Sequence, residues 1–171
     1  TFVMARRDLM TIFANGMQGA DLGLIEGVRG LYEGAESLGD TGSSAAVAKL
    51  LGIPVVLVVS ARSITRSAAA IVKGFQSFDP AINIRGIILN NVAGSQHIRK
   101  ATEAIEHHCG IPVIGAVPRQ PEMELAMRHL GLVPYLEGKN APAFLERIQA
   151  ITGMIGEHID RDALLGLSSP V

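Results

Sequence analysis

Three short apolar runs separated by helical patterns constrain the fold of this chain most. Residues 54–59, 86–90 and 113–117 are rich in valine and isoleucine and carry no charge. Runs of this kind are typical of strands that are buried on both faces of a sheet. Helical patterns alternate with them, over about residues 42–51, 65–75 and 97–107. This βαβα order predicts an α/β fold in which a parallel sheet is covered by helices through right-handed crossovers.

Further segments extend this expectation towards both ends of the chain. An apolar segment over residues 22–26 is predicted to form a fourth strand that ends at Glu26. A helical pattern over about residues 142–155 repeats apolar side chains at helical spacing, namely Phe144, Ile148, Ile151 and Ile155. That stripe predicts a helix with one apolar face packed on the sheet. Residues 160–167 are predicted to be a short helix or a linker towards another domain.

Composition narrows the class of protein. The chain has 171 residues, of which 48% are hydrophobic and 18% are charged, as expected for one compact domain. A net charge of -1 and an aromatic content of 4% count against a nucleic-acid groove, because phosphate binding requires a basic face. No apolar run approaches the roughly twenty residues of a membrane span. Cys109 is the only cysteine, so no internal disulfide is possible, and a cytoplasmic protein is predicted.

The most informative candidate for a ligand site is a glycine-rich segment with two carboxylates, residues 26–34, which we call the acidic loop. Glu26 and Glu33 flank it, and its glycines are Gly27, Gly30 and Gly34. Glycine allows a backbone to approach a ligand closely, and an acid at the end of a strand can hold Mg²⁺ or a substrate group. The alternative for Glu26 is that it is the first solvated residue after a strand. The number of glycines favours a functional loop.

Other candidates lie at a helix start and at strand ends. Gly42, Ser43 and Ser44 open a helix, where free N–H groups favour an anion, although Thr41 or Ser43 as a simple cap is the stronger interpretation. Asn90 ends one predicted strand, and Pro118 and Arg119 end another. No phosphate-binding motif of the form G-x-x-x-x-G-K-[ST] occurs in the chain.

These segments together resemble the cobyrinic acid a,c-diamide synthase family, which includes nickel-sirohydrochlorin a,c-diamide synthases of coenzyme F430 biosynthesis. The resemblance follows the chain in order from about residue 2 to residue 165. It rests on the acidic loop and on further segments, namely residues 42–45, 48–52, 54–59, 66–69, 86–90, 115–119 and 128–133.

The resemblance implies a fold, a domain organisation and a reaction. Residues 1–158 correspond to part of an ATP-binding synthetase domain with a doubly wound parallel sheet of the P-loop NTPase, dethiobiotin-synthetase-like type, lacking its N-terminal P-loop unit. Residues 159–171 are expected to be a linker to a C-terminal glutaminase domain of the same chain. ATP and Mg²⁺ activate carboxylates of a tetrapyrrole as acyl phosphates, and glutamine-derived ammonia converts the a and c acetates to amides. A homodimer is also expected.

The resemblance also implies roles for individual residues. Glu26 corresponds to the acid that binds magnesium, and Glu33 occupies a catalytic position where the family usually has Asp. Gly42, Ser43 and Ser44 are expected to receive the substrate or a phosphate at their helix start, and Arg29, which departs from the family pattern, is a further candidate for substrate binding. The positions expected near the nucleotide are Asn90, Pro118 and Arg119. Arg29 replaces a frequent Met, and it could pair with Glu33 or reach a substrate carboxylate.

Two alternatives from other classes stay open at this stage. One is another dethiobiotin-synthetase-like ligase without a glutaminase. The other is a regulatory P-loop ATPase that works by nucleotide-dependent dimerisation. Because the chain does not begin with Met and lacks a P-loop, we expect it to be part of a longer enzyme and to be inactive alone.

Overall fold

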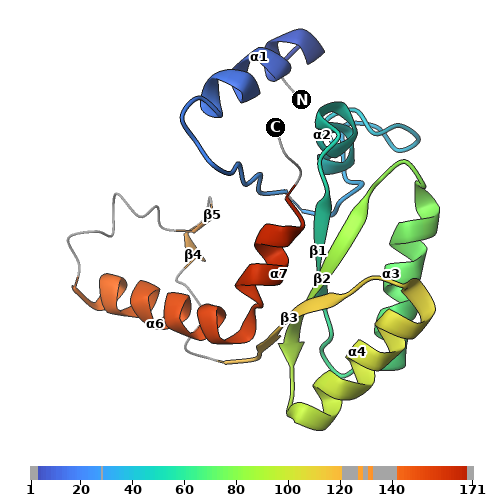
Figure 1. The fold of residues 1–171 in the computed structure, drawn as a ribbon, viewed down its shortest axis with the longest axis vertical. Coiled ribbons are helices and arrows are strands. Elements are labelled where there is room, and N and C mark those ends of the chain that lie inside the picture. Colours follow the sequence, from blue (N-terminus) through green and yellow to red (C-terminus); the bar gives the residue numbers. More distant parts are fainter. Residues whose placement is uncertain (1–3, 28, 121–126, 129–130, 133–141, 169–171) are drawn as a thin grey trace.

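The computed structural model describes residues 4–27, 29–120, 127–128, 131–132 and 142–168 (Figure 1). In chain order its elements are α1 (Arg6–Gly16), α2 (Ser44–Leu51), β1 (Val55–Ser60), α3 (Arg66–Phe78), β2 (Ile84–Val92), α4 (Ser95–Cys109), β3 (Val113–Pro118), β4 (Met127–Arg128), β5 (Gly131–Leu132), α6 (Pro142–His158) and α7 (Arg161–Gly166).

The centre of the fold is a parallel sheet in the order β1-β2-β3. In register, Val59 lies opposite Leu89, and Leu89 lies opposite Ala116. The predicted α/β class and the predicted runs of strand are confirmed for these three elements. A separate antiparallel pair joins β4 to β5. Residues 129, 130 and 133 of the family-like segment 128–133 lie outside the described residues.

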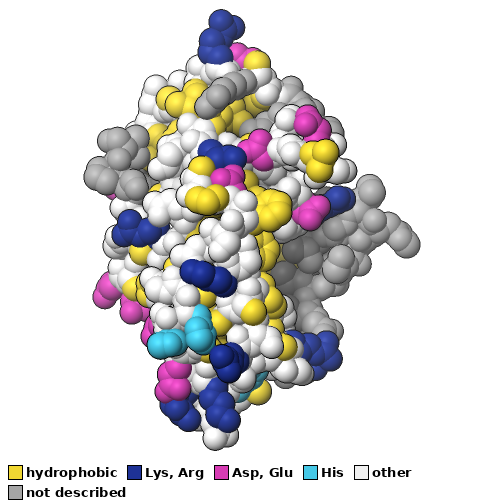
Figure 2. All heavy atoms as spheres, turned by 90° about the vertical axis from the view of Figure 1, so that its right-hand side faces the viewer, with side chains coloured by type: hydrophobic (Ala, Val, Ile, Leu, Met, Phe, Trp, Pro, Cys, Tyr) yellow, Lys and Arg dark blue, Asp and Glu magenta, His cyan; other side chains and the backbone are white. Residues whose placement is uncertain are grey.

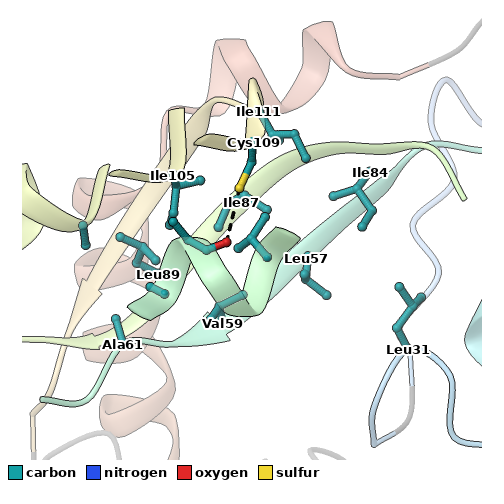
Figure 3. Packing of buried hydrophobic residues seen from close by; sticks show 14 of the residues in the cluster. Leu31, Leu57, Val59, Ala61, Ile84, Ile87, Leu89, Ile105, Cys109 and Ile111 are labelled. Atoms are coloured by element: carbon teal, nitrogen blue, oxygen red, sulfur yellow. Dashed lines mark hydrogen bonds between the residues drawn. The ribbon is translucent and has the colours of Figure 1, made fainter. Parts of the chain in front are cut away.

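Helices pack on both faces of this sheet, although Val58 of β1 stays 60% exposed. On one face α3 and α4 pack together, α3 contacts β1 and α4 contacts β3, and Ile87, Leu89 and Ile105 are completely buried in the core that they form with the sheet (Figure 3). On the other face α7 lies beside the sheet (Figure 1). There, a Cβ atom added at Gly86 would lie 2.8 Å from Cδ1 of Leu167. The glycine therefore allows α7 to pack closely on β2.

Local signals fix where two of the helices end. α2 is followed by Gly52 with φ 65°, and α4 is followed by Gly110 with φ 66°. Both glycines take the left-handed conformation, which ends a helix at little cost when the residue has no Cβ. The strands β1 and β3 begin within a few residues of these stops, so the alternation of elements follows directly from the glycine positions.

The only cysteine belongs to this packing rather than to a reactive site. The Cys109 thiol is buried at the end of α4 and donates to the Ala69 carbonyl oxygen at 3.4 Å (Figure 3). Burial raises the pKa of Cys109, and the nearby Lys73 offsets this only in part. The thiol is therefore a poor nucleophile, as expected for a structural cysteine.

Three features differ from the sequence expectations. The predicted fourth strand is wrong, because residues 22–26 form no strand and are exposed, with Leu24 at 89%. A strand requires a neighbouring strand for its backbone hydrogen bonds, and no described strand pairs with this segment. The helix α1 was not expected. The apolar stripe of α6 is half-buried rather than part of the core, and α6 contacts the sheet at β3.

None of the helices in the described part of the chain combines the length and the apolar character that crossing a bilayer requires.

Candidate functional site

The amino end of α2 forms one part of the candidate site. Ser43 is 1% exposed and has extended backbone angles, and its Oγ accepts a hydrogen bond from the Ala46 N–H at 3.0 Å. This is the geometry of a helix N-cap. The cap interpretation of Ser43 is therefore confirmed. The hydroxyl of Ser44 and the backbone of Gly42, with φ 80°, lie beside it.

The acidic loop lies directly against this helix end. The Ala45 N–H donates to the Leu31 carbonyl oxygen at 2.9 Å, and the Ala35 N–H donates to the Thr41 oxygen at 2.8 Å. A Cβ atom added at Gly34 would lie 2.5 Å from that Thr41 oxygen, and one at Gly27 would lie 2.9 Å from Oγ of Ser44. The glycines of the loop thus allow it to approach α2. The structure brings the loop together with Gly42, Ser43 and Ser44.

The charged side chains of the acidic loop are exposed. Glu26, Arg29 and Glu33 all face solvent. The Glu33 side chain folds back over Gly30, where an added Cβ atom would lie 3.1 Å from Cγ of Glu33. Arg29 has φ 60°, which is strained for a residue with a side chain. The pair between Arg29 and Glu33 does not form among the described residues.

Tyr32 anchors the acidic loop to the end of α3. Its hydroxyl donates to the Phe75 carbonyl oxygen at 2.7 Å, and its ring lies 5.7 Å from the Phe75 ring and 4.6 Å from the Phe78 ring. Burial, and then the negative charge of Asp79, raise the pKa of Tyr32. The phenol therefore stays protonated and acts as a donor. The loop is fixed to the fold at its centre, next to the acid Glu33.

Two salt bridges stabilise the same region, where the acidic loop meets the end of α3. Lys49 of α2 bridges Asp40 at 2.6 Å and Asp79 at 2.7 Å. Its hydrogen bond, followed by that of the Ala81 N–H, lowers the pKa of Asp79. The hydrogen bonds to Asp40 and Asp79 raise the pKa of Lys49. The bridge ties α2 and the segment before it to the turn between α3 and β2.

The pH dependence of this bridge follows from the signs of the shifts. The lowered pKa of Asp79 contributes stability above about pH 4, which is lost as the pH falls through its folded pKa. The raised pKa of Lys49 contributes stability below about pH 10.4, which is lost as the pH rises through its folded pKa. We expect Lys49→Met to lower the melting temperature of the full-length protein modestly and equally from pH 5 to 9, with a smaller difference below pH 4. A difference that grows on acidification would contradict this account.

The cap at Ser43 gives a second local prediction. Ser43→Ala should weaken the first turn of α2 by about 1 kcal/mol, because the Ala46 N–H loses its acceptor inside the protein. Hydrogen exchange of the α2 amides in the full-length protein should then accelerate about fivefold. Ser67→Ala, at an exposed serine of α3, is the matched control and should leave α2 unchanged. Equal exchange rates of the α2 amides in Ser43→Ala and Ser67→Ala would show that the Ser43 side chain does not stabilise this helix.

The second part of the candidate site lies at the carboxyl edge of the sheet. The Asn90 carbonyl oxygen accepts from the Ala61 N–H at 2.8 Å, and Oδ1 of Asn90 accepts from the Asn91 N–H at 2.9 Å. Pro118 is in register with Val92, and the Arg119 N–H donates to the Val92 oxygen at 3.2 Å. Asn90, Pro118 and Arg119 are therefore brought together, with the side chain of Arg119 exposed.

These two parts of the site are separate in this structure. The contacts of Tyr32 and Lys49 place the acidic loop near residues 75–79, just before β2 begins, whereas Asn90 lies near the end of β2. Nine residues of strand extend roughly 26 Å at about 3.3 Å per step. The predicted metal acid and the predicted nucleotide residues thus lie at opposite edges of the sheet.

A hollow of about 730 Å³ lies elsewhere, at the surface formed by the start of α3 and by α4. Arg66, Lys100 and His107 are among the residues that line it, and Figure 2 shows basic and histidine side chains on this face. None of the predicted site residues lines it. Within the described part of the chain, no group of three or more His, Cys, Asp or Glu side chains is arranged to hold a metal ion.

Sequence reasoning missed Tyr32, Lys49 and His97 as residues that organise these edges. The contacts of Tyr32 and Lys49 join positions 43 and 30 residues apart, and those of His97 join positions 4 and 33 residues apart. No spacing along the chain signals such contacts. An aromatic residue within a glycine-rich loop is the one signal that could have indicated Tyr32.

Comparison with known proteins gives the family. A family model described as an AAA domain matches residues 5–126. Because this match covers more than half of the chain, the chain belongs to the AAA domain family.

Curated relatives are similar along almost the whole chain. The protein named cobyrinate a,c-diamide synthase from Methanosarcina acetivorans is 48% identical, over 98% of this chain and 35% of the relative. Proteins of the same name from Methanosarcina barkeri and Methanothermobacter thermautotrophicus are 46% and 44% identical, over 98% and 99% of this chain and 35% and 38% of the relatives. The chain therefore spans little more than a third of these relatives. The resemblance to cobyrinic acid a,c-diamide synthases is confirmed, and no solved structure matches significantly.

Proposed function

We propose that the full-length protein is an ATP-dependent, amide-forming ligase that converts the a and c acetate side chains of a tetrapyrrole to amides. The observation that carries this proposal is the 48% identity over 98% of the chain to a protein named cobyrinate a,c-diamide synthase. Residues 1–158 contribute to an ATP-binding synthetase domain of the dethiobiotin-synthetase-like type. Residues 159–171 lead towards a glutaminase domain of the same protein.

The proposed reaction has two steps, because a carboxylate does not react with ammonia until it is activated. A carboxylate oxygen of the substrate attacks the γ-phosphorus of ATP, ADP leaves, and an acyl phosphate forms. Ammonia released from glutamine then attacks the acyl carbon, phosphate departs with the electrons of the C–O bond, and the nitrogen loses a proton. Phosphoryl transfer depends mainly on positioning and on stabilising negative charge. The residues of this chain are proposed to serve those two purposes.

Mg²⁺ is the metal that this proposal implies, and Glu26 is the residue that would hold it. Mg²⁺ keeps several waters and commonly binds one or two carboxylates together with substrate phosphates. An exposed single carboxylate beside the Ser44 hydroxyl suits such a site, because Gly27 brings the backbone after Glu26 against Ser44. The absence of a larger acidic cluster among the described residues is compatible with this mode of binding. When bound, the ion offsets charge on the transferred phosphoryl group.

The remaining site residues form two groups, one at the acidic loop and one at the carboxyl edge of the sheet. At the acidic loop, Glu33 is the proposed catalytic residue, acting on the activated substrate or on ammonia. Arg29, which makes no ion pair among the described residues, and the Ser44 hydroxyl beside Gly42 at the helix start are proposed to bind substrate carboxylates, while the buried Ser43 holds this turn as the N-cap.

At the carboxyl edge, Asn90, Pro118 and Arg119 are proposed to contact the nucleotide, as ligands of open α/β sheets commonly lie there. Both groups serve one reaction only if the acidic loop and this edge approach one another in the full-length protein. Association into a homodimer is part of the same proposal.

The decisive experiment uses the full-length protein with ATP, Mg²⁺ and glutamine. Cobyrinic acid and nickel-sirohydrochlorin are offered in parallel, and amide formation is followed by mass spectrometry. We expect two amidations of one macrocycle, which would identify the substrate, and no product when ATP is omitted. Replacing glutamine by ammonium salts tests the glutaminase separately. ATP hydrolysis without amidation of either macrocycle would reject the proposal and favour another ligase of this fold.

A further inference from the structure

His97 in the first turn of α4 holds two loops at the carboxyl edge of the sheet. Its Nδ1 accepts a hydrogen bond from the Ala93 N–H at 3.0 Å, in the loop that follows β2. Its Nε2 lies 2.6 Å from the Ile64 carbonyl oxygen, in the loop that follows β1. The ring is half-buried between them. Both loops leave the sheet at the same edge because the strands are parallel (Figure 1).

The two contacts together fix the chemical state of the ring. Because a backbone N–H points at Nδ1, that nitrogen must carry a lone pair, and because a carbonyl oxygen faces Nε2, that nitrogen must carry the proton. Of the three protonation forms of histidine, only the neutral Nε2–H form makes both hydrogen bonds. His97 is thus a bridge that accepts from one loop and donates to the other.

The bridged loops carry the residues of the carboxyl edge. Ala93 directly follows Val92, whose oxygen accepts from the Arg119 N–H. On the other side, the Ile64 N–H donates to the Ala61 oxygen, and the Ala61 N–H donates to the Asn90 oxygen. Along these paths, two hydrogen bonds connect the imidazole to Arg119 and three connect it to Asn90.

Backbone strain shows that this edge is held firmly. Ser63, in the loop that follows β1, has φ 60°, and Asn91, near the end of β2, has φ 59°. Left-handed angles at residues with side chains cost of order 1–3 kcal/mol and persist only where the surroundings impose them. The side-chain amide of Asn91 also donates to Oγ of Ser60 at 3.3 Å, so the strand ends from which the two loops leave are linked to each other.

We propose that His97 is a positioning residue for the nucleotide site: as the neutral Nε2–H imidazole it locks the loops after β1 and β2, and so sets the positions of Asn90 and Arg119 for ATP. The nucleotide part of this inference rests on the proposed function. The bridge itself does not, because it follows from the two contacts alone.

Three substitutions separate the two bonds of the bridge. His97→Ala removes both. His97→Asn places an amide oxygen where Nδ1 stood and keeps only the acceptor for Ala93, whereas His97→Gln reaches the position of Nε2 and keeps only the donor to Ile64. His108→Ala, at an exposed histidine of the same helix, is the matched control.

The first readout is hydrogen exchange of the full-length protein, followed in the peptide that covers residues 91–98. His97→Ala and His97→Gln should accelerate exchange of the Ala93 amide about fivefold or more, the factor associated with one lost hydrogen bond. His97→Asn and His108→Ala should preserve its protection. Unchanged exchange in His97→Ala would overturn the bridge. If His97→Ala fails to fold, the contrast between the Asn and Gln variants still decides the point.

The second readout is the dissociation constant for a non-hydrolysable ATP analogue with Mg²⁺. His97→Ala should weaken binding at least fivefold, with smaller losses in the Asn and Gln variants and none in His108→Ala. Faster exchange with unchanged affinity, or a wild-type protein that does not bind the analogue, would overturn the positioning role. If the wild-type protein binds the analogue but amidates neither macrocycle, the proposed function fails and the inference about His97 stands.

Discussion

Replacement of Glu26 by Gln in the full-length protein is expected to reduce ATP- and Mg²⁺-dependent amidation at least about 100-fold, with the fold unchanged. A carboxylate that holds the metal at the transferred phosphoryl group contributes several kcal/mol to transition-state stabilisation, and each 1.36 kcal/mol corresponds to a factor of ten in rate. Glutamine is close in size to glutamate but carries no charge. The measurement is the initial rate of amide formation as a function of Mg²⁺ concentration.

The structure predicts that this variant folds normally. Glu26 is exposed and makes no ion pair among the described residues, so removing its charge costs little stability. Glu36→Gln, in the exposed segment after the acidic loop, is the control and should retain the wild-type rate. Near-normal turnover of Glu26→Gln at limiting Mg²⁺ would remove Glu26 from the metal site and leave the alternative that it is simply the first solvated residue after an apolar segment.

The parts of the fold that could be predicted depend on short stretches of sequence. The apolar runs within β1, β2 and β3 predict strands of a sheet with helices on both faces, and their alternation with helical patterns predicts a parallel order, although Val58 of β1 is 60% exposed in the structure. Gly52 and Gly110 mark helix ends because the left-handed backbone conformation favours glycine. Such signals are present in the sequence itself.

The parts that could not be predicted depend on distant partners. Residues 22–26 have the composition of a strand, but a strand exists only where another strand accepts its hydrogen bonds, and composition does not reveal that partner. The position of the acidic loop likewise depends on Tyr32 and Lys49, which contact residues beyond position 74. The sequence therefore suggests candidate site residues, but it does not reveal that the acidic loop lies away from the carboxyl edge of the sheet.

Substitution of Gly34 by Ala is expected to detach the acidic loop from α2. The added Cβ atom would lie 2.5 Å from the Thr41 oxygen and 3.3 Å from the Ser43 nitrogen, and both are backbone atoms that cannot rotate away. The loop must move to relieve this steric overlap, and the movement breaks the hydrogen bond from the Ala35 N–H to the same Thr41 oxygen. Strain of this kind typically costs 1–3 kcal/mol. Hydrogen exchange of residues 31–46 in the full-length protein should accelerate roughly 5- to 150-fold.

Gly74→Ala provides the matched control, because a Cβ atom at Gly74 in α3 meets nothing within 4 Å. Alanine in a helix interior is favoured over glycine by about 0.5–1 kcal/mol, so this variant should be slightly more stable than the wild type. If Gly34→Ala accelerates exchange and also lowers amidation while Gly74→Ala does neither, the contact between the loop and α2 is required for the activity. If Gly34→Ala leaves exchange unchanged, the loop does not pack on α2 in the full-length protein, and the site must be rebuilt around a different position of Glu26 and Glu33.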